Sequence, residues 1–264
     1  MAFLAVPGPF DFALTTERFR VFGADRANLW HEGGLHRVVG DREVRIEAAD
    51  GGVDVEPLDA ETEPVVRMLL GFAFDLDAFY SGAAGDELLA VIVPRLAGFR
   101  PPLTPDPFEM LVGAIISQQV SLFSALAIRN RLIERFGVRA KEAWSFPTRD
   151  RLAAATEDEL LALGFSRRKA EYVGGLARAD LDLDALAVLP DEEVKTRLTA
   201  LRGIGEWTAE WFLARHLARP HAWPAGDLAL RKAVAPLDVY AARVRFHPFE
   251  NLSAHYLLLS QRIP

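Results

Sequence analysis

Asp227 and two tryptophans upstream of it have the residue types and the spacing for chemistry on a positively charged species. Trp207 and Trp211 are four residues apart, which places both indoles on one face of a helix. Aromatic faces attract cations. A carboxylate can stabilise a developing positive charge, position a water molecule or accept its proton. Asp227, Trp207 and Trp211 are therefore residues of the types that such chemistry would use.

These three residues also have structural alternatives. Asp227 directly precedes Leu228-Ala-Leu-Arg231, so it could cap the N-terminus of a helix. The two roles are compatible, because a helix N-terminus favours an ionised carboxylate. Trp207 and Trp211 could equally be core residues, since large aromatic side chains on a helix often pack inside a protein.

A turn that contains two glycines precedes this segment. Gly203, Ile204 and Gly205 separate two predicted helices. Glycine permits a positive φ and the close approach of another backbone. The unobstructed N–H groups at the start of the second helix would form a seat for phosphate. A plain connection between two helices remains the alternative.

From Pro101 onward the sequence is typical of a helical domain. Asp106-Pro-Phe-Glu109 and Thr156-Glu-Asp-Glu159 have the pattern of capping boxes at helix starts. Apolar spacing predicts further helices over residues 122–136, 166–177 and 191–201. We therefore expect a helical domain over residues 99–264, joined to the preceding part near residues 98–103.

Residues 1–98 are predicted to form a separate α+β domain. Alternation with period two predicts an antiparallel sheet, and two segments predict helices that flank it. The predicted strands cover residues 10–16, 29–39 and 43–48, and the predicted helices cover residues 63–70 and 87–93. The expected fold class is mainly α, with a small N-terminal α+β domain.

The charge of the chain is unevenly distributed. The 264 residues hold 30 Lys+Arg against 37 Asp+Glu, and the net charge of −7 argues mildly against a nucleic-acid partner. Residues 1–100 carry −8, whereas residues 195–262 hold 10 Lys+Arg against 5 Asp+Glu, a net charge of +5. Because the local field follows local charge, the region around Asp227 could face phosphates. A solvated basic surface is the alternative.

Several classes of site and location are excluded or disfavoured. The absence of cysteine excludes disulfides, thiolate metal sites and a cysteine nucleophile. The spacing of the six histidines predicts no metal cluster. Without an apolar run long enough for a bilayer or a signal-peptide pattern, we expect a cytoplasmic, nucleoid-associated protein and no membrane partner.

Three motifs carry a resemblance to one family. The segment from Leu198 to Glu210 resembles the helix-hairpin-helix of the DNA glycosylase superfamily in which a Gly/Pro-rich loop and an aspartate follow the hairpin. Trp223-Pro-Ala-Gly-Asp227 stands at the place of that loop and aspartate. The segment from Asp106 to Ser121 is similar to the one by which the 3-methyladenine DNA glycosylase II (AlkA-type) branch reaches DNA.

The resemblance implies a monofunctional DNA glycosylase with two helical lobes and an active cleft between them. Such an enzyme hydrolyses the N-glycosidic bond of alkylated bases, of the 3-methyladenine and 7-methylguanine type, in duplex DNA and so initiates base excision repair. We expect a monomer that binds a flipped base, with Asp227 stabilising the oxocarbenium-like sugar. The implied further roles are DNA-backbone contacts for Gly203, Ile204, Gly205 and Thr208, a base pocket of Trp207, Trp211, Leu228 and Leu258, and an intercalating wedge at Gln119.

Some positions depart from the family pattern or leave alternatives open. Relatives that also cut the strand use a lysine two residues after the second hairpin glycine, and Trp207 at that position has no amine to form a Schiff base. Leu228 and Leu258 replace aromatic residues that can line the pocket, which leaves the substrate range open. Gln119 could instead cap a helix end.

The resemblance requires no cofactor, although the carbonyl groups of Thr199, Leu201 and Ile204 could bind a monovalent cation, Na⁺ or K⁺. Two other functions remain open. One is a non-catalytic protein that binds damaged DNA, and the other is a glycosylase with lyase activity for oxidised bases.

Overall fold

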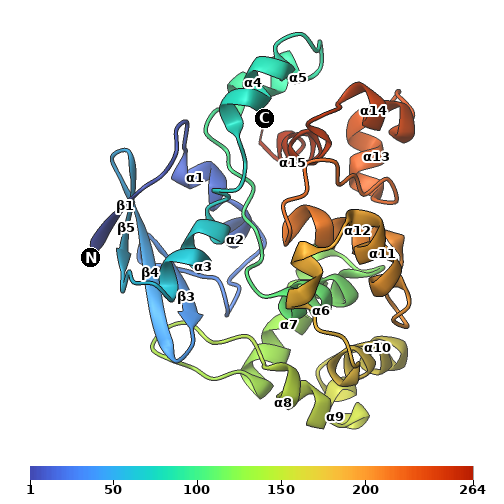
Figure 1. Cartoon of the computed structure of the whole chain (residues 1–264). Coiled ribbons are helices and arrows are strands. Elements are labelled where there is room, and N and C mark those ends of the chain that lie inside the picture. The colour runs from blue at the N-terminus through green and yellow to red at the C-terminus, as the bar shows by residue number, and fades with distance from the viewer. Residues whose placement is uncertain (264) are drawn as a thin grey trace.

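The computed structural model describes residues 1–263, and a small antiparallel sheet lies beside a larger group of helices (Figure 1). The sheet has the strand order β1-β5-β4-β3-β2, and all neighbouring pairs are antiparallel. The strands are β1 (Ala2–Ala5), β2 (Leu29–His31), β3 (Gly34–Val39), β4 (Arg42–Ala49) and β5 (Gly52–Glu56). The predicted combination of a mainly helical chain with an N-terminal sheet is confirmed.

Helices make up most of the chain after the sheet, and none within residues 1–263 is long and apolar enough to cross a membrane. They are α1 (Phe12–Thr15), α2 (Arg18–Val21), α3 (Thr62–Leu69), α4 (Leu76–Ala83), α5 (Leu89–Arg95), α6 (Pro107–Ser117), α7 (Leu122–Phe136), α8 (Arg149–Ala154), α9 (Glu157–Ala162), α10 (Arg167–Arg178), the 3-10 helix η1 (Asp184–Val188), α11 (Asp191–Thr199), α12 (Glu206–Arg215), α13 (Leu228–Val234), α14 (Val239–Arg245) and α15 (Glu250–Ser260). The predicted helices over residues 122–136, 166–177 and 191–201 correspond to α7, α10 and α11.

One predicted strand is wrong. Residues 10–16 contain the short helix α1 instead, because the carboxylate of Asp11 accepts a hydrogen bond from the N–H of Leu14 at 2.8 Å and so caps a helical turn. The segment 29–39 forms two strands, β2 and β3, since a turn at Glu32 and Gly33 with positive φ divides it.

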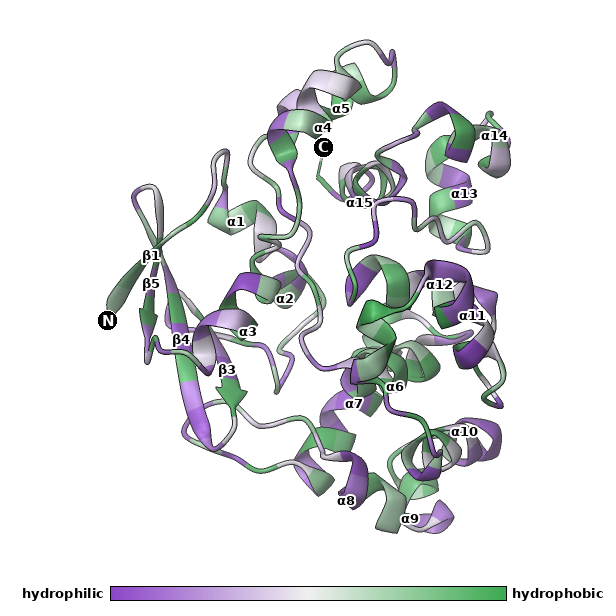
Figure 2. Ribbon diagram, in the orientation of Figure 1, coloured by the Kyte–Doolittle hydropathy of each residue, from purple (hydrophilic) through white to green (hydrophobic). Residues whose placement is uncertain are grey.

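Three hydrophobic clusters fill the interior. The sheet cluster combines the sheet with α1, α2 and α3. The central cluster contains α6, α7 and the helices up to α12, and Figure 2 shows largely apolar residues on α6 in the centre of the molecule. The C-terminal cluster joins α4 and α5 to α13, α14 and α15.

The clusters divide the chain differently from the boundary that the sequence suggests after residue 98. The helix predicted over residues 87–93 forms as α5, but it packs with the C-terminal helices rather than on the sheet. In the same cluster, the ring of Phe79 on α4 contacts the rings of Phe249 and Tyr256 edge-on. Apolar periodicity identifies the buried face of a helix, but not the element that covers it.

The connection near residues 98–103 is a buried segment with fixed contacts. Arg100 is 1% exposed, and its guanidinium donates hydrogen bonds to the carbonyl oxygens of Pro7, Gly71 and Phe74 at 2.7, 3.2 and 2.8 Å. These carbonyls belong to the N-terminal part of the chain. Arg100 therefore ties the start of the helical region to the sheet side of the molecule.

A buried ionic network also joins the sheet to the helices. Asp106 caps α6, but the Glu109 side chain does not complete the predicted capping box. It binds Arg37 of β3 and Arg129 of α7 instead, at 2.6 and 2.5 Å, and Arg129 also binds Asp25. Burial would raise the pKa of the Glu109 carboxyl, but the two guanidinium groups lower it to about 2.

This network predicts a large stability cost for Glu109→Gln. Neutralising Glu109 leaves the buried guanidinium of Arg37 without a carboxylate and that of Arg129 with Asp25 alone, and we expect the free energy of unfolding at pH 7 to fall by about 3–5 kcal/mol. Urea unfolding measures this free energy. The half-exposed Glu63, which pairs with Arg67, provides the control, and Glu63→Gln should cost less than about 1 kcal/mol.

The pKa of Glu109 predicts how the stability of the fold depends on pH. This pKa is about 2 in the folded protein and near the ordinary 4.5 in the unfolded chain, so the stabilisation by the carboxylate is present above pH 4.5 and is lost as the pH falls towards 2. The difference between wild type and Glu109→Gln should therefore shrink over that range. Equal stability of the two proteins at pH 7 would contradict the assignment.

Candidate active site

The turn between α11 and α12 is held from both sides. Gly203 has a φ of +91°, and a Cβ atom there would overlap the ring of Tyr172 on α10. The carbonyl oxygen of Gly203 accepts a hydrogen bond from Nε2 of Gln118 at 3.0 Å. The turn therefore has a fixed position relative to α10 and to the end of α6.

The second glycine of the turn has different surroundings. Gly205 precedes α12 with an extended backbone, and a Cβ atom there would meet no atom of the described residues within 4 Å. No side chain of residues 1–263 caps α12 by a hydrogen bond. An open glycine before an uncapped helix has the arrangement of a backbone anion seat.

Two other residues predicted to contact DNA have buried side chains. Ile204 is 5% exposed and Thr208 is 1% exposed. The Thr208 hydroxyl therefore has no access to a phosphate in this structure, because the side chain points into the protein. Only the main-chain groups of these two residues remain for such a contact.

Both oxygens of the Asp227 carboxylate accept two N–H hydrogen bonds each. Oδ1 binds the backbone N–H groups of Ala229 and Leu230 at 2.9 and 3.1 Å, and this contact caps α13. Oδ2 binds the indole N–H groups of Trp207 and Trp211, both at 3.1 Å. The capping role and the neighbourhood of the two tryptophans therefore occur together, and four N–H donors suit a group that only accepts.

A cavity of about 940 Å³ opens beside this carboxylate. Trp207 and Trp211 line it, as do Leu228 and Leu258. Trp211 is buried at 2% exposure, whereas Leu228 is 73% exposed and lies at the rim. The structure thus brings the four predicted pocket residues to one cavity, and the two leucines leave part of its wall aliphatic.

The predicted wedge residue stands at the same cavity. Gln119 follows α6 with a φ of +55°, and its side chain is exposed. A left-handed backbone at a residue other than glycine is costly and marks a position that surrounding structure holds. The neighbouring Gln118, and not Gln119, is the C-cap of α6.

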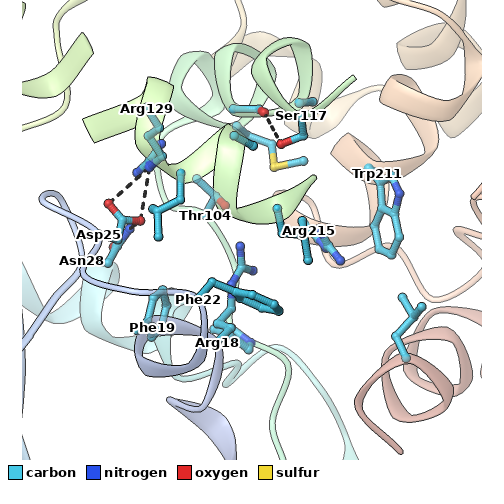
Figure 3. Close-up of a pocket in the computed structure, with 18 of the residues that line it drawn as sticks. Arg18, Phe19, Phe22, Asp25, Asn28, Thr104, Ser117, Arg129, Trp211 and Arg215 are labelled. Carbon is cyan, nitrogen blue, oxygen red and sulfur yellow. Dashed lines mark hydrogen bonds and ion pairs between the residues drawn. The ribbon is translucent and has the colours of Figure 1, made fainter. Parts of the chain in front are cut away.

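Six basic side chains line the cavity, namely Arg18, Arg37, Arg129, Arg215, His255 and Arg262, and none of them is among the predicted site residues. Arg215 places its guanidinium carbon 3.6 Å from the ring centre of Trp211, and Figure 3 shows both residues at the cavity with Arg18. Burial lowers the pKa of Arg215, which still remains protonated at neutral pH. The ring of buried His255 meets Trp211 edge-on at 5.7 Å, and burial holds the pKa of this imidazole well below its usual value.

One signal in the sequence points to Arg215. Trp207, Trp211 and Arg215 follow one another at intervals of four residues, which places them along one face of α12. No comparable signal exists for Arg18 or His255, because they reach the cavity from α2 and α15.

The sequence also did not predict a cluster of His221, His247 and Glu250, which lies outside the cavity. His221 and His247 stack at 5.0 Å, and their Nδ1 atoms lie 3.0 and 3.1 Å from the carboxylate of Glu250. Burial would raise the pKa of Glu250, but the two imidazoles lower it. Histidine spacing alone could not predict this group, because His221 is far in the sequence from His247 and Glu250.

Comparison with known proteins gives one consistent picture. Residues 112–245 match the family model described as HhH-GPD superfamily base excision DNA repair protein. A DNA-3-methyladenine glycosylase of Bacillus subtilis is 33% identical over 59% of this chain and 54% of its own length. DNA-3-methyladenine glycosylase 2 of Escherichia coli is 36% identical over 72% of this chain and 65% of its own length. The chain thus spans about half to two thirds of these curated relatives.

A solved structure matches nearly the whole chain. The 3-methyladenine DNA-glycosylase from Archaeoglobus fulgidus superposes with a TM-score of 0.87 at 28% identity, over 99% of this chain and 98% of that one. An 8-oxoguanine glycosylase/lyase of Clostridium acetobutylicum, bound to double-stranded DNA, shares the fold with a TM-score of 0.80 at 21% identity.

The contacts of Asp227 predict that Asp227→Asn is destabilising. The amide NH₂ must face either the two indole N–H groups or the two backbone N–H groups, so two donors lose their acceptor. We expect the free energy of unfolding to fall by about 1–3 kcal/mol, measured by urea or thermal unfolding.

Asp238 provides a matched control. It caps α14 with hydrogen bonds from the N–H groups of Tyr240 and Ala241, and no indole binds its carboxylate. Because asparagine is as good an N-cap as aspartate, Asp238→Asn should change stability by less than about 0.5 kcal/mol. Equal effects of the two substitutions would show that the indole contacts do not matter.

Proposed function

Because the chain belongs to the HhH-GPD superfamily of base excision DNA repair proteins, we propose that it is a monofunctional DNA glycosylase. It hydrolyses the N-glycosidic bond of alkylated bases, of the 3-methyladenine and 7-methylguanine type, in duplex DNA. The observation that carries the proposal is the Asp227 carboxylate, which is fixed by four N–H donors beside an aromatic cavity. The names of the relatives agree with this reaction class.

In this proposal, Asp227 acts mainly through its charge. Loss of the base leaves an oxocarbenium-like sugar, and a fixed anion nearby lowers the energy of that cation. A carboxylate has about four lone-pair sites, and four N–H groups already bind them. Electrostatic stabilisation is therefore favoured over proton abstraction from water.

The active cleft would lie between two helical lobes. The central and C-terminal clusters form these lobes, and Asp227 stands between α12 of the first and α13 of the second. The flipped base would enter the cavity along Trp207 and Trp211, and Gln119 at its rim would fill the gap in the duplex. The DNA backbone would bind the open start of α12 at Gly205.

The position of Trp207 argues against a lyase step. Its indole nitrogen donates to Asp227 and cannot form a Schiff base with the sugar. The protein would act as a monomer on duplex DNA, without a membrane partner and without a required cofactor.

A monovalent cation remains part of the proposal. No backbone N–H of the turn donates to the carbonyl oxygens of Thr199 or Ile204, whereas the carbonyl of Leu201 accepts from the Ile204 N–H at 3.1 Å. Carbonyl oxygens with free lone pairs suit Na⁺ or K⁺, so the carbonyls of Thr199 and Ile204 are available to such an ion. When bound, it would supply a positive charge beside the DNA phosphate.

A base-release assay tests the function. Wild type incubated with methylated duplex DNA should release free 3-methyladenine or 7-methylguanine, and Asp227→Asn should lower the single-turnover rate at least about 100-fold. Asp238→Asn, which changes a cap outside the cavity, should leave the rate unchanged.

The base-release assay, together with DNA binding and borohydride trapping, separates the alternative functions. DNA binding without release of any base would support a non-catalytic binder of damaged DNA. A covalent adduct trapped by borohydride would support a glycosylase with lyase activity. Undiminished release by Asp227→Asn would refute the role of this carboxylate.

A further inference from the structure

Two histidines and one glutamate form a cluster that the proposed reaction does not use. His221 belongs to the loop between α12 and α13, whereas His247 precedes α15 and Glu250 is the first residue of that helix. None of the three lines the cavity beside Asp227. These three residues are called the His–His–Glu cluster below.

The ligand atoms of the cluster lie close together. Nδ1 of His221 lies 3.0 Å from Oε2 of Glu250, and Nδ1 of His247 lies 3.1 Å from Oε1. One nitrogen or oxygen atom of each residue lies within 4.8 Å of those of the other two. In a tetrahedral zinc site the ligand atoms are about 2.0–2.2 Å from the ion and so about 3.4 Å from one another. A small movement of the imidazoles therefore gives the spacing that a metal ion requires.

The two imidazoles are accessible from solvent. Their rings stack at a centroid distance of 5.0 Å and an interplanar angle of 20°. The side chain of His221 is 46% exposed and that of His247 is 64% exposed. A neutral imidazole can bind a metal through Nδ1 while it carries its proton on Nε2. A metal ion can thus reach the cluster without a change in the fold, and it replaces only the two hydrogen bonds to Glu250.

The Glu250 carboxylate lacks a permanent counterion. Its side chain is 5% exposed, and its ion-pair partners within residues 1–263 are the two imidazoles alone. By contrast, the similarly buried Glu109 pairs with two guanidinium groups, and Glu210 pairs with the ammonium group of Lys195 at 3.4 Å. An imidazole is a weaker counterion, because it is charged only when protonated. Buried charges in proteins are paired or coordinate a metal, so a metal cation suits this carboxylate.

We propose that the His–His–Glu cluster is a binding site for a divalent transition metal, with zinc as the ion that fits best. Two imidazole nitrogens and one carboxylate are a ligand set that zinc takes in proteins, with water in the fourth position. Mg²⁺ prefers oxygen ligands alone and does not fit this set. The inference does not depend on the glycosylase function.

The metal fastens the loop that ends at Asp227 to the start of α15. The N–H of Asn251 on α15 already donates a hydrogen bond to the carbonyl oxygen of Pro220 in this loop, at 3.0 Å. A metal bound to His221 and to the two other residues of the cluster adds a second link at the next position of the loop. Because the cluster lies outside the cavity, the metal stabilises the fold and takes no part in bond cleavage.

Zinc binding to the metal-free protein tests the proposal. The whole chain, without a histidine tag, is treated with EDTA, and Zn²⁺ binding is measured by isothermal titration calorimetry. His221→Gln and His247→Gln each remove one ligand from an exposed position. His31→Gln is the matched control, because the His31 side chain is 42% exposed and lies 3.8 Å from the carboxylate of Glu32, but belongs to no group of three ligands within the described residues.

We expect wild type to bind one zinc ion per chain. Loss of an outer-shell partner alone weakens metal affinity about 10- to 100-fold, so loss of a ligand in His221→Gln or His247→Gln should raise Kd at least about 100-fold. His31→Gln should bind as wild type does. Saturating Zn²⁺ should raise the midpoint of thermal unfolding of wild type and His31→Gln by about 5 °C or more, and Mg²⁺ at the same concentration should not.

Co²⁺ provides a measurement that needs no variant. Tetrahedral Co²⁺ absorbs visible light far more strongly than six-coordinate Co²⁺ in water does. Wild type loaded with Co²⁺ should show these strong bands, and one equivalent of Zn²⁺ should abolish them.

Three results would overturn the proposal. One is the absence of zinc binding or of the Co²⁺ bands in wild type, and the second is binding by His221→Gln and His247→Gln with the wild-type Kd. The third is an equal thermal shift with Mg²⁺, which would indicate an unspecific effect of charge. Each would leave the cluster as a hydrogen-bonded contact only. Base release is not measured here, so failure of this proposal and failure of the glycosylase function are separate results.

Discussion

The hydrogen bonds of the Asp227 carboxylate are the constraint on which the site depends. Oδ1 fixes the start of α13, and Oδ2 fixes the indoles of Trp207 and Trp211 on α12. One side chain therefore sets the position of a helix start, two aromatic walls and a negative charge relative to one another. The contacts to the α13 backbone and those to the two indoles each use half of the hydrogen bonds of Asp227.

The rest of the molecule holds the two sides of the cavity in place. Glu109 anchors α6 to the sheet through Arg37, while Arg100 binds carbonyl oxygens of the N-terminal part. Gln118, at the end of α6, holds the carbonyl of Gly203. The segment that carries Gln119, the hairpin and the sheet therefore form one connected framework, in which the N-terminal part contributes Arg18 to the cavity.

Local signals in the sequence predicted local structure well. The capping box at Thr156 and Glu159 forms as expected, since its two hydrogen bonds involve residues three apart. The same pattern at Asp106 predicted the helix cap correctly but not the partner of Glu109. Glu109 binds Arg37 and Arg129, which are far away in the sequence. Asp227 and its tryptophans could be found from spacing and resemblance, but His255 could not, because only tertiary packing brings it to Trp211.

We infer that the fixed Asp227 carboxylate stabilises a cationic sugar, and binding of transition-state analogues tests this inference most directly. The measurement compares Kd for duplex DNA with a cationic pyrrolidine in place of the sugar and for the same duplex with a neutral tetrahydrofuran abasic site. We predict that wild type prefers the cationic analogue at least about 100-fold, or about 2.7 kcal/mol, and that Asp227→Asn loses this preference while it binds the neutral analogue as wild type does. An equal preference of the two proteins for the cation would contradict the account.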